Sequence, residues 1–148
     1  MTAQTITGIG NEVASRIGLD PSARSAGAAN GTGIDRTGFN SCALIALAGA
    51  VTGAPSAQTF DVKLQHADTL GGSYTDFVPS IPQPSPTGAV AQLTAASSLK
   101  KRSIDLKTAK KFIRAVGTVA FTGGTAPTLN TSAVIVLGGA DTLPQVDD

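Results

Sequence analysis

The sequence predicts an all-β fold, a β-sandwich or jelly roll with an extended N-terminal arm. Two observations carry this prediction. Short apolar segments of strand length follow one another, separated by turn residues drawn from 17 Gly and 8 Pro in a chain of 148 residues. No long segment shows the 3.6-residue apolar period of an amphipathic helix. Strands of this length and punctuation are typical of two packed antiparallel sheets.

The chain is expected to consist of an extended arm over residues 1–38 and a β-sandwich domain with a short C-terminal tail over residues 39–148. Gly, Ala, Ser and Thr dominate the arm. Its one periodic stretch is a short helical turn at Asn11–Ile17, where Val13 and Ile17 share a face. The arm has too few apolar side chains to offset the entropy of ordering its backbone. We therefore expect it to be mobile in the free protein and ordered against a partner.

The first dense apolar segment is Phe39–Val51, which reads FNSCALIALAGAV. Its period alone does not separate helix from strand, and its alanines favour a helix. The turn that follows it at Gly53–Pro55 and the alternating segment beyond favour a buried strand. We predict a strand.

A β-hairpin is predicted over Thr59–Phe77. Phe60, Val62, Leu64 and His66 alternate with polar residues, as in a strand with one buried face. The segment DTLGG supplies turn residues, and the alternation then resumes as far as Phe77. One face of this hairpin should therefore lie in the core.

The rest of the chain contains a connector, four further strands and a tail. Val78–Gly88 carries four prolines, which exclude a central strand. The strands are predicted at Ala89–Thr94, Ser103–Leu106, Phe112–Phe121 and Ser132–Leu137. The last is a β-branched apolar run, typical of a strand covered on both faces. The tail, Gly138–Asp148, ends in acidic residues.

The composition points to covered surface. Charged residues make up 14% of the chain, against about 25% in ordinary soluble domains. Ser and Thr can keep part of the surface soluble, and neighbouring subunits can cover the rest, because interface cores are depleted in charge. We expect a homo-oligomer, a trimer before a dimer. The net charge of +1 is too small for the protein as a whole to attract a polyanion.

No catalytic or cofactor-binding constellation is recognisable. His66 is the one histidine, and no serine can be tied to it and Asp68 as a triad would require. One His, one Cys and scattered carboxylates show neither zinc spacing nor a calcium loop. Cys42 has no partner for an internal disulfide. We expect no enzymatic activity, no cofactor, no metal and no membrane segment.

One segment concentrates positive charge. Lys100–Arg114 holds seven of the 11 basic residues and one Asp. Three interpretations stay open: a solvated loop and edge strand whose lysines discourage sheet-to-sheet pairing, a contact with an acidic partner surface, and, with only Phe112 for stacking, nucleic acid. The candidate partner-binding residues are Lys100, Lys101, Arg102, Lys107, Lys110, Lys111 and Arg114.

Three segments resemble the capsid cement or decoration proteins of tailed bacteriophages. They are Phe60–Phe77, Lys110–Val116 and Ala133–Leu143, with sequences FDVKLQHADTLGGSYTDF, KKFIRAV and AVIVLGGADTL. The resemblance implies a β-sandwich virion protein, made in the host cytoplasm, that binds the outer capsid surface and braces neighbouring major capsid subunits. The alternative is a virion-displayed adhesion module that binds the host surface or carbohydrate, although Tyr74 is the one residue of the Trp or Tyr type that sugar sites generally use.

Overall fold

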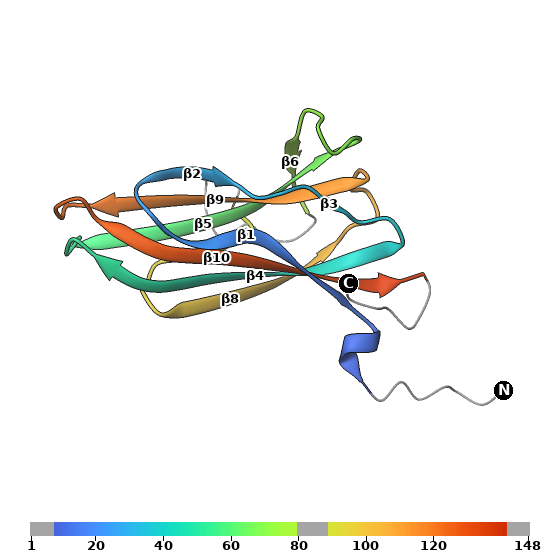
Figure 1. Cartoon of the computed structure of the whole chain (residues 1–148), viewed down its shortest axis with the longest axis horizontal. Coiled ribbons are helices and arrows are strands. Elements are labelled where there is room, and N and C mark those ends of the chain that lie inside the picture. The colour runs from blue at the N-terminus through green and yellow to red at the C-terminus, as the bar shows by residue number, and fades with distance from the viewer. Residues whose placement is uncertain (1–7, 80–88, 142–148) are drawn as a thin grey trace.

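The computed structural model describes residues 8–79 and 89–141, and this part of the chain consists mainly of β-strands (Figure 1). One turn of 3-10 helix, η1 (Ile9–Asn11), precedes the first strand. The strands are β1 (Ala14–Arg24), β2 (Gly27–Asn30), β3 (Ile34–Asp35), β4 (Phe39–Thr52), β5 (Ala57–Ala67), β6 (Thr75–Phe77), β7 (Ala91–Leu93), β8 (Ser98–Asp105), β9 (Phe112–Thr122) and β10 (Thr128–Ala140).

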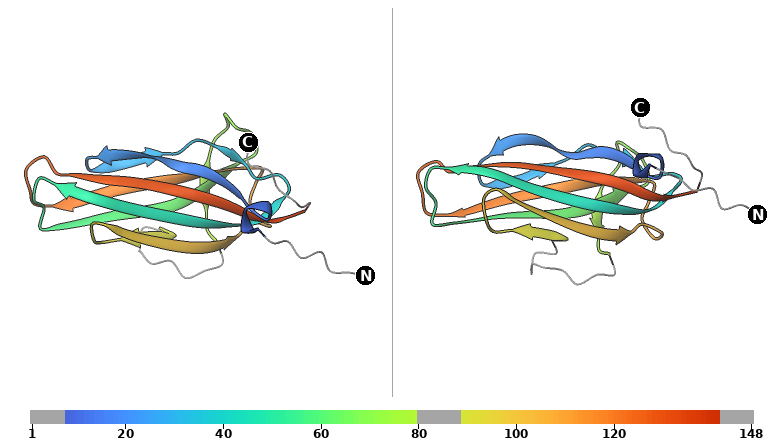
Figure 2. Two further views of the ribbon diagram at one scale, coloured as in Figure 1. Left: turned by 60° about the horizontal axis from the view of Figure 1, so that its bottom comes forward. Right: turned by 90° about the horizontal axis from the view of Figure 1, so that it is seen from below.

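Two antiparallel sheets pack face to face as a β-sandwich, which confirms the fold class predicted from the sequence (Figures 1 and 2). Sheet A has the strand order β1-β10-β4-β8. Sheet B has the order β2-β9-β5-β6, with β3 paired to β9 and β7 paired to β5. η1 and the last residues of β10 lie at the same end of the sandwich (Figure 2).

The core lies between the sheets and is filled by alternate residues of the long strands. Phe60, Val62 and Leu64 on β5 are fully buried, as the predicted hairpin requires. Ile135 and Leu137 of β10 belong to the same cluster. Each side chain of this size contributes about 1.5–3 kcal/mol when it is buried. The alternation seen in the sequence therefore defines the core.

Gly117 interrupts the buried row of β9 because its neighbours already occupy the space. A Cβ atom at this position would lie 2.6 Å from Phe60 Cε2 and 2.7 Å from Leu19 Cδ2. Glycine lets both side chains pack directly against the backbone of β9.

The extended arm expected over residues 1–38 is wrong for residues 14–35, because β1, β2 and β3 are part of the sandwich. β1 pairs with β10 in sheet A, and Leu19 is buried in the core. β2 and β3 pair with β9 in sheet B. A Cβ atom on Gly31 would lie 1.6 Å from the carbonyl oxygen of Gly18. Glycine is therefore needed at position 31, where the chain after β2 passes directly against the backbone of β1. Residues 1–7 lie outside the described residues.

The helical turn expected at Asn11–Ile17 is also wrong. η1 ends at Asn11, and β1 begins at Ala14. The i, i+4 spacing of Val13 and Ile17 fits one face of a strand as well as one face of a helix. Pairing with β10 selects the strand.

The other predicted strands are confirmed as elements. Antiparallel pairing of β5 with β6, Leu64 opposite Phe77, forms the predicted hairpin. β4, β7 and β9 occupy their predicted segments, and β8 begins at Ser98 rather than at Ser103. β10 is longer than the predicted Ser132–Leu137 and runs from Thr128 to Ala140, so the first residues of the expected tail, 138–140, belong to this strand. Residues 80–88 of the expected connector and residues 142–148 of the tail lie outside the described residues.

Candidate functional site

The outer face of sheet A carries apolar side chains in register across its strands. Ile17, Val134 and Ile45 lie side by side on β1, β10 and β4, and Lys101 of β8 ends this row. In the next row, Val136 of β10 is paired with Ala43 of β4. The whole set, named here the apolar face, consists of Ile17, Ala43, Ile45, Leu47, Leu99, Val134 and Val136.

Parts of the apolar face are open to solvent in the single chain. Ile17 is 60% exposed and Leu99 is 62% exposed. Val134 and Val136 are half-buried, so the prediction that Ser132–Leu137 is covered on both faces is wrong for the isolated subunit. The inward residues of this strand enter the core, whereas in the described chain the outward ones are shielded only by side chains of the neighbouring strands. Contiguous apolar surface of this kind marks interaction sites.

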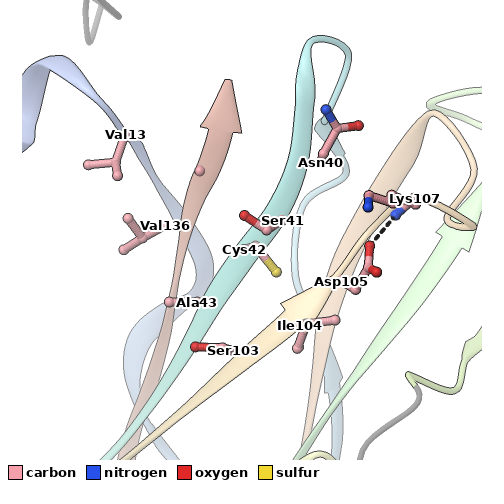
Figure 3. Close-up of a pocket in the computed structure, with 11 residues that line it drawn as sticks. Val13, Asn40, Ser41, Cys42, Ala43, Ser103, Ile104, Asp105, Lys107 and Val136 are labelled. Atoms are coloured by element: carbon pink, nitrogen blue, oxygen red, sulfur yellow. Dashed lines mark hydrogen bonds between the residues drawn. The ribbon is translucent and has the colours of Figure 1, made fainter. Parts of the chain in front are cut away.

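A groove of about 560 Å³ opens at one end of the apolar face (Figure 3). Val136, Ala43 and Ser103 follow one another across β10, β4 and β8 along it. Val13 lines the β1 side, and the backbone N–H of Lys107 donates a 2.9 Å hydrogen bond to Asp105 Oδ1 at the other rim. The groove is mainly apolar and has charged groups only at this rim.

A second groove, of about 440 Å³, lies at the other end of sheet A. Pro21, Leu47 and Ser132 are among its lining residues. The β1–β10 register shifts between Leu19 and Ser22, so β1 bulges beside this groove. The apolar face therefore extends between two shallow depressions.

The outer face of sheet B is chemically different, because its side chains bond to one another. Arg114 donates to Gln65 Oε1 through Nε at 2.9 Å and Nη2 at 2.7 Å. Gln65 Nε2 donates to Asp76 Oδ1 at 2.8 Å, and Lys63 Nζ lies 2.8 Å from Asp76 Oδ2. The Arg114 guanidinium also lies 4.2 Å from the centre of the Tyr74 ring. This set is named here the polar network.

Hydrogen bonding in the polar network lowers the pKa of Asp76 below its usual value of 3.8. The hydrogen bond from Lys63 is the largest cause, followed by that from Gln65. Both favour the ionised carboxylate. The network thus presents groups that are already satisfied within the subunit.

The seven candidate partner-binding residues do not form one patch. Lys100, Lys101 and Arg102 lie on β8, an edge strand of sheet A. Arg102 is opposite the buried Leu44, so it points toward the inner side. Inward charges of this kind protect an edge strand from pairing with another sheet.

The remaining candidates have partners or lie in a loop. Lys110 Nζ lies 2.7 Å from Asp68 Oδ2, and Lys111 Nζ lies 3.6 Å from Asp35 Oδ2. Lys107 is exposed in the loop after β8. Arg114 belongs to the polar network. Their role in partner binding stays a prediction.

His66 has a structural environment. Its Nδ1 accepts a hydrogen bond from the backbone N–H of Lys110 at 3.2 Å, and its ring centre lies 5.2 Å from that of Phe77. Desolvation and the charge of Lys110 lower its pKa below 6.5. Burial raises the pKa of the Cys42 thiol to about 12, so the thiol is protonated at neutral pH.

Metal-ligating clusters and membrane-spanning helices are absent from residues 8–79 and 89–141. This part of the chain holds no group of three or more His, Cys, Asp or Glu that could bind a metal ion. It also contains no helix long and apolar enough to span a membrane.

The apolar face was not predicted from the sequence, although one signal for it is present. In the segment CALIALA of β4, apolar residues occupy both parities, so both faces of the strand are apolar. Only tertiary structure shows that Leu44 points into the core while Ile45 points outward.

No family model matches the chain, and no curated protein matches its sequence. Solved structures do match, and two of them are described here. One is the SPBc2 prophage-derived protein YomS, which is 14% identical with a TM-score of 0.45 over 86% of this chain and 94% of that chain. The other, described as "Bacillus endospore appendages form a novel family of disulfide-linked pili", is 11% identical with a TM-score of 0.39 over 93% of this chain and 97% of that chain. Likenesses at these values carry no conclusion about function.

Proposed function

We propose that this chain is a non-enzymatic structural protein of a phage virion, a cement protein that binds the outer capsid surface and braces neighbouring major capsid subunits. The observation that carries the assembly role is the apolar face. A rigid sheet presents Ile17 and Leu99 to solvent, and such surface is costly unless another protein covers it.

The virion setting rests on the sequence resemblance in Phe60–Phe77, Lys110–Val116 and Ala133–Leu143. Parts of all three segments lie on long strands, residues 60–67 on β5, 112–116 on β9 and 133–140 on β10, so they correspond to structural parts of the sandwich. A cement protein needs a stable module and repeated weak contacts rather than a catalytic centre. Multivalency over many copies converts modest contacts into strong attachment.

Charged groups at the β8 edge of sheet A and in the loop after β8 suit contact with the coat. Lys100, Lys101 and Lys107 are exposed, and electrostatic complementarity with an acidic coat surface would speed association and fix its orientation. Tyr74 stacks on Arg114 within the polar network, which leaves the adhesion alternative without a free aromatic platform of the Tyr type in the described residues.

The test is a comparison of particles with and without this protein. We expect it to copurify with intact particles at a fixed, high copy number, and its removal to leave heads that break at lower temperature or under osmotic shock. A cryo-EM map should place its density across adjacent capsomers. Density at fibre tips with unchanged head strength would support adhesion instead, and absence from the particle would refute both functions.

A further inference from the structure

We infer that the apolar face is the contact surface of a homodimer, in which sheet A of one copy packs face to face on sheet A of a second copy. The inference deepens the proposed assembly role and rests on it for its biological setting. A second copy of this chain would cover the apolar face, and the resulting assembly would be a closed dimer.

The distribution of charge on sheet A fits an interface core with a rim. Outward positions over residues 41–47 of β4, 132–136 of β10 and 15–17 of the edge strand β1 hold Ser, Ala, Val, Ile and Leu. The exposed Asn130 of β10 and Asp20 of β1 lie beyond this stretch, toward one end of the sheet, and Arg16 lies opposite the buried Ile135, on the inner side. Outward charges, Lys101 and Asp105, occur on the edge strand β8. Protein interfaces show the same arrangement, with charge depleted at the centre and retained at the edge.

The area is sufficient for a dimer. Four strands spaced about 4.8 Å apart, over the stretch Ser41–Ala48 of β4 at about 3.3 Å per residue, give a face of roughly 500 Å² per copy in projection. Side-chain relief enlarges the accessible surface beyond this projection. Two such faces together reach the roughly 1,000 Å² of total buried area that a specific interface requires.

Shape favours a second copy over an unrelated protein. Two copies of one sheet have the same right-handed twist, and twisted sheets pack aligned at about −30° and about 10 Å apart. In the rows of the apolar face, the polar side chains that β10 and β4 point outward are serines. This face therefore offers few directional hydrogen bonds that could select a different protein as partner. Because each copy uses the same surface, the pairing closes at two copies.

Sedimentation velocity on the full chain from about 1 to 100 µM tests the inference. The wild type should sediment as a species of twice the 14.7 kDa chain mass. The double variant Ile17→Lys with Leu99→Lys should be monomeric, its dissociation constant raised at least about 100-fold, because each charge is present twice in a symmetric interface. Both positions are more than half exposed, so the subunit should fold, as circular dichroism and urea unfolding would verify.

The matched control places the same charges on sheet B. Thr59→Lys with Ala120→Lys alters a cross-strand pair on the outer face of that sheet and should leave the dimer intact. A trimer, a dimer that survives Ile17→Lys with Leu99→Lys, or a dimer lost equally in the control would overturn the inference. A monomeric wild type would also overturn the homodimer. If such a monomer still bound to particles, the proposed cement function would stand without the dimer. Absence of the protein from particles is the separate result that would refute the proposed function.

Discussion

The two outer faces of the sandwich differ although the two inner faces are alike. Both sheets send apolar side chains inward to one core. Outward, sheet A presents the apolar face, while sheet B presents the polar network of Arg114, Gln65, Asp76 and Lys63. The inward residues therefore stabilise the fold of the subunit, whereas the outward residues determine which molecules it can bind. A polar face can satisfy itself within one chain, but an apolar face needs another surface.

The largest loss of stability should come from truncating an inward leucine, and it should far exceed the loss from truncating an outward leucine. Leu64→Ala, at a fully buried position, should lower the free energy of unfolding by about 2–5 kcal/mol, because it leaves a cavity. Leu99→Ala, on the apolar face, should change it by less than about 0.5 kcal/mol in dilute monomer. Urea unfolding measures both; equal losses would mean that the apolar face is part of the subunit's core.

The polar network should contribute a smaller, local stabilisation. Arg114→Ala removes two hydrogen bonds to Gln65 and the contact with Tyr74, and we expect a loss of about 1–2 kcal/mol in urea unfolding. Arg114→Lys should recover only part of it, since a lysine lacks the planar fork of donors. Full recovery by lysine would show that charge alone matters. Neither variant should alter the dimer.

The pH dependence of the free energy of unfolding should distinguish two ionisable side chains of sheet B, His66 and Asp76. The folded-state pKa of His66 lies below 6.5, so the unfolded chain takes up the proton first and stability falls as the pH drops below about 6.5. The folded-state pKa of Asp76 lies below 3.8, so its stabilisation is present above about 3.8 and disappears as the pH falls through that region.

Urea midpoints measured from pH 8 to pH 3 should therefore be flat at the alkaline end and decline in two stages. His66→Asn should remove the first stage. Asp76→Asn should reduce the second, to which Asp35 also contributes, because hydrogen bonds from Thr37 hold its pKa below 3.8 against the opposing effect of desolvation. A decline that is unchanged in His66→Asn would assign the first stage to another group.

The smallest effect should come from an exposed ion pair. Lys110→Ala breaks the 2.7 Å pair with Asp68 and should cost less than about 0.5 kcal/mol, because solvent screens such pairs. The backbone N–H of residue 110 still reaches His66 in this variant. A loss comparable with that of Arg114→Ala would show that the basic turn before β9 is more than a solvated surface.

Much of the fold was predictable because its signals are local. Alternation in β5 identified Phe60, Val62 and Leu64 as core residues, and Gly and Pro marked the breaks between strands. The arm was mispredicted because the pairing of β1 with β10 joins the two ends of the chain, and no local pattern reports such a partner. Its few apolar residues suffice once β9 and β10 supply the hydrogen bonds.

The sequence by itself determined the strands, the inward set of side chains and the low charge that indicates covered surface. Tertiary structure alone decided that Ile17, Ile45, Val134 and Leu99 meet on one face, and that the basic segment is divided between an edge strand, a turn and the polar network. The physical reason is that alternation specifies two faces for each strand, whereas what covers each face depends on pairing and packing between residues far apart in the chain.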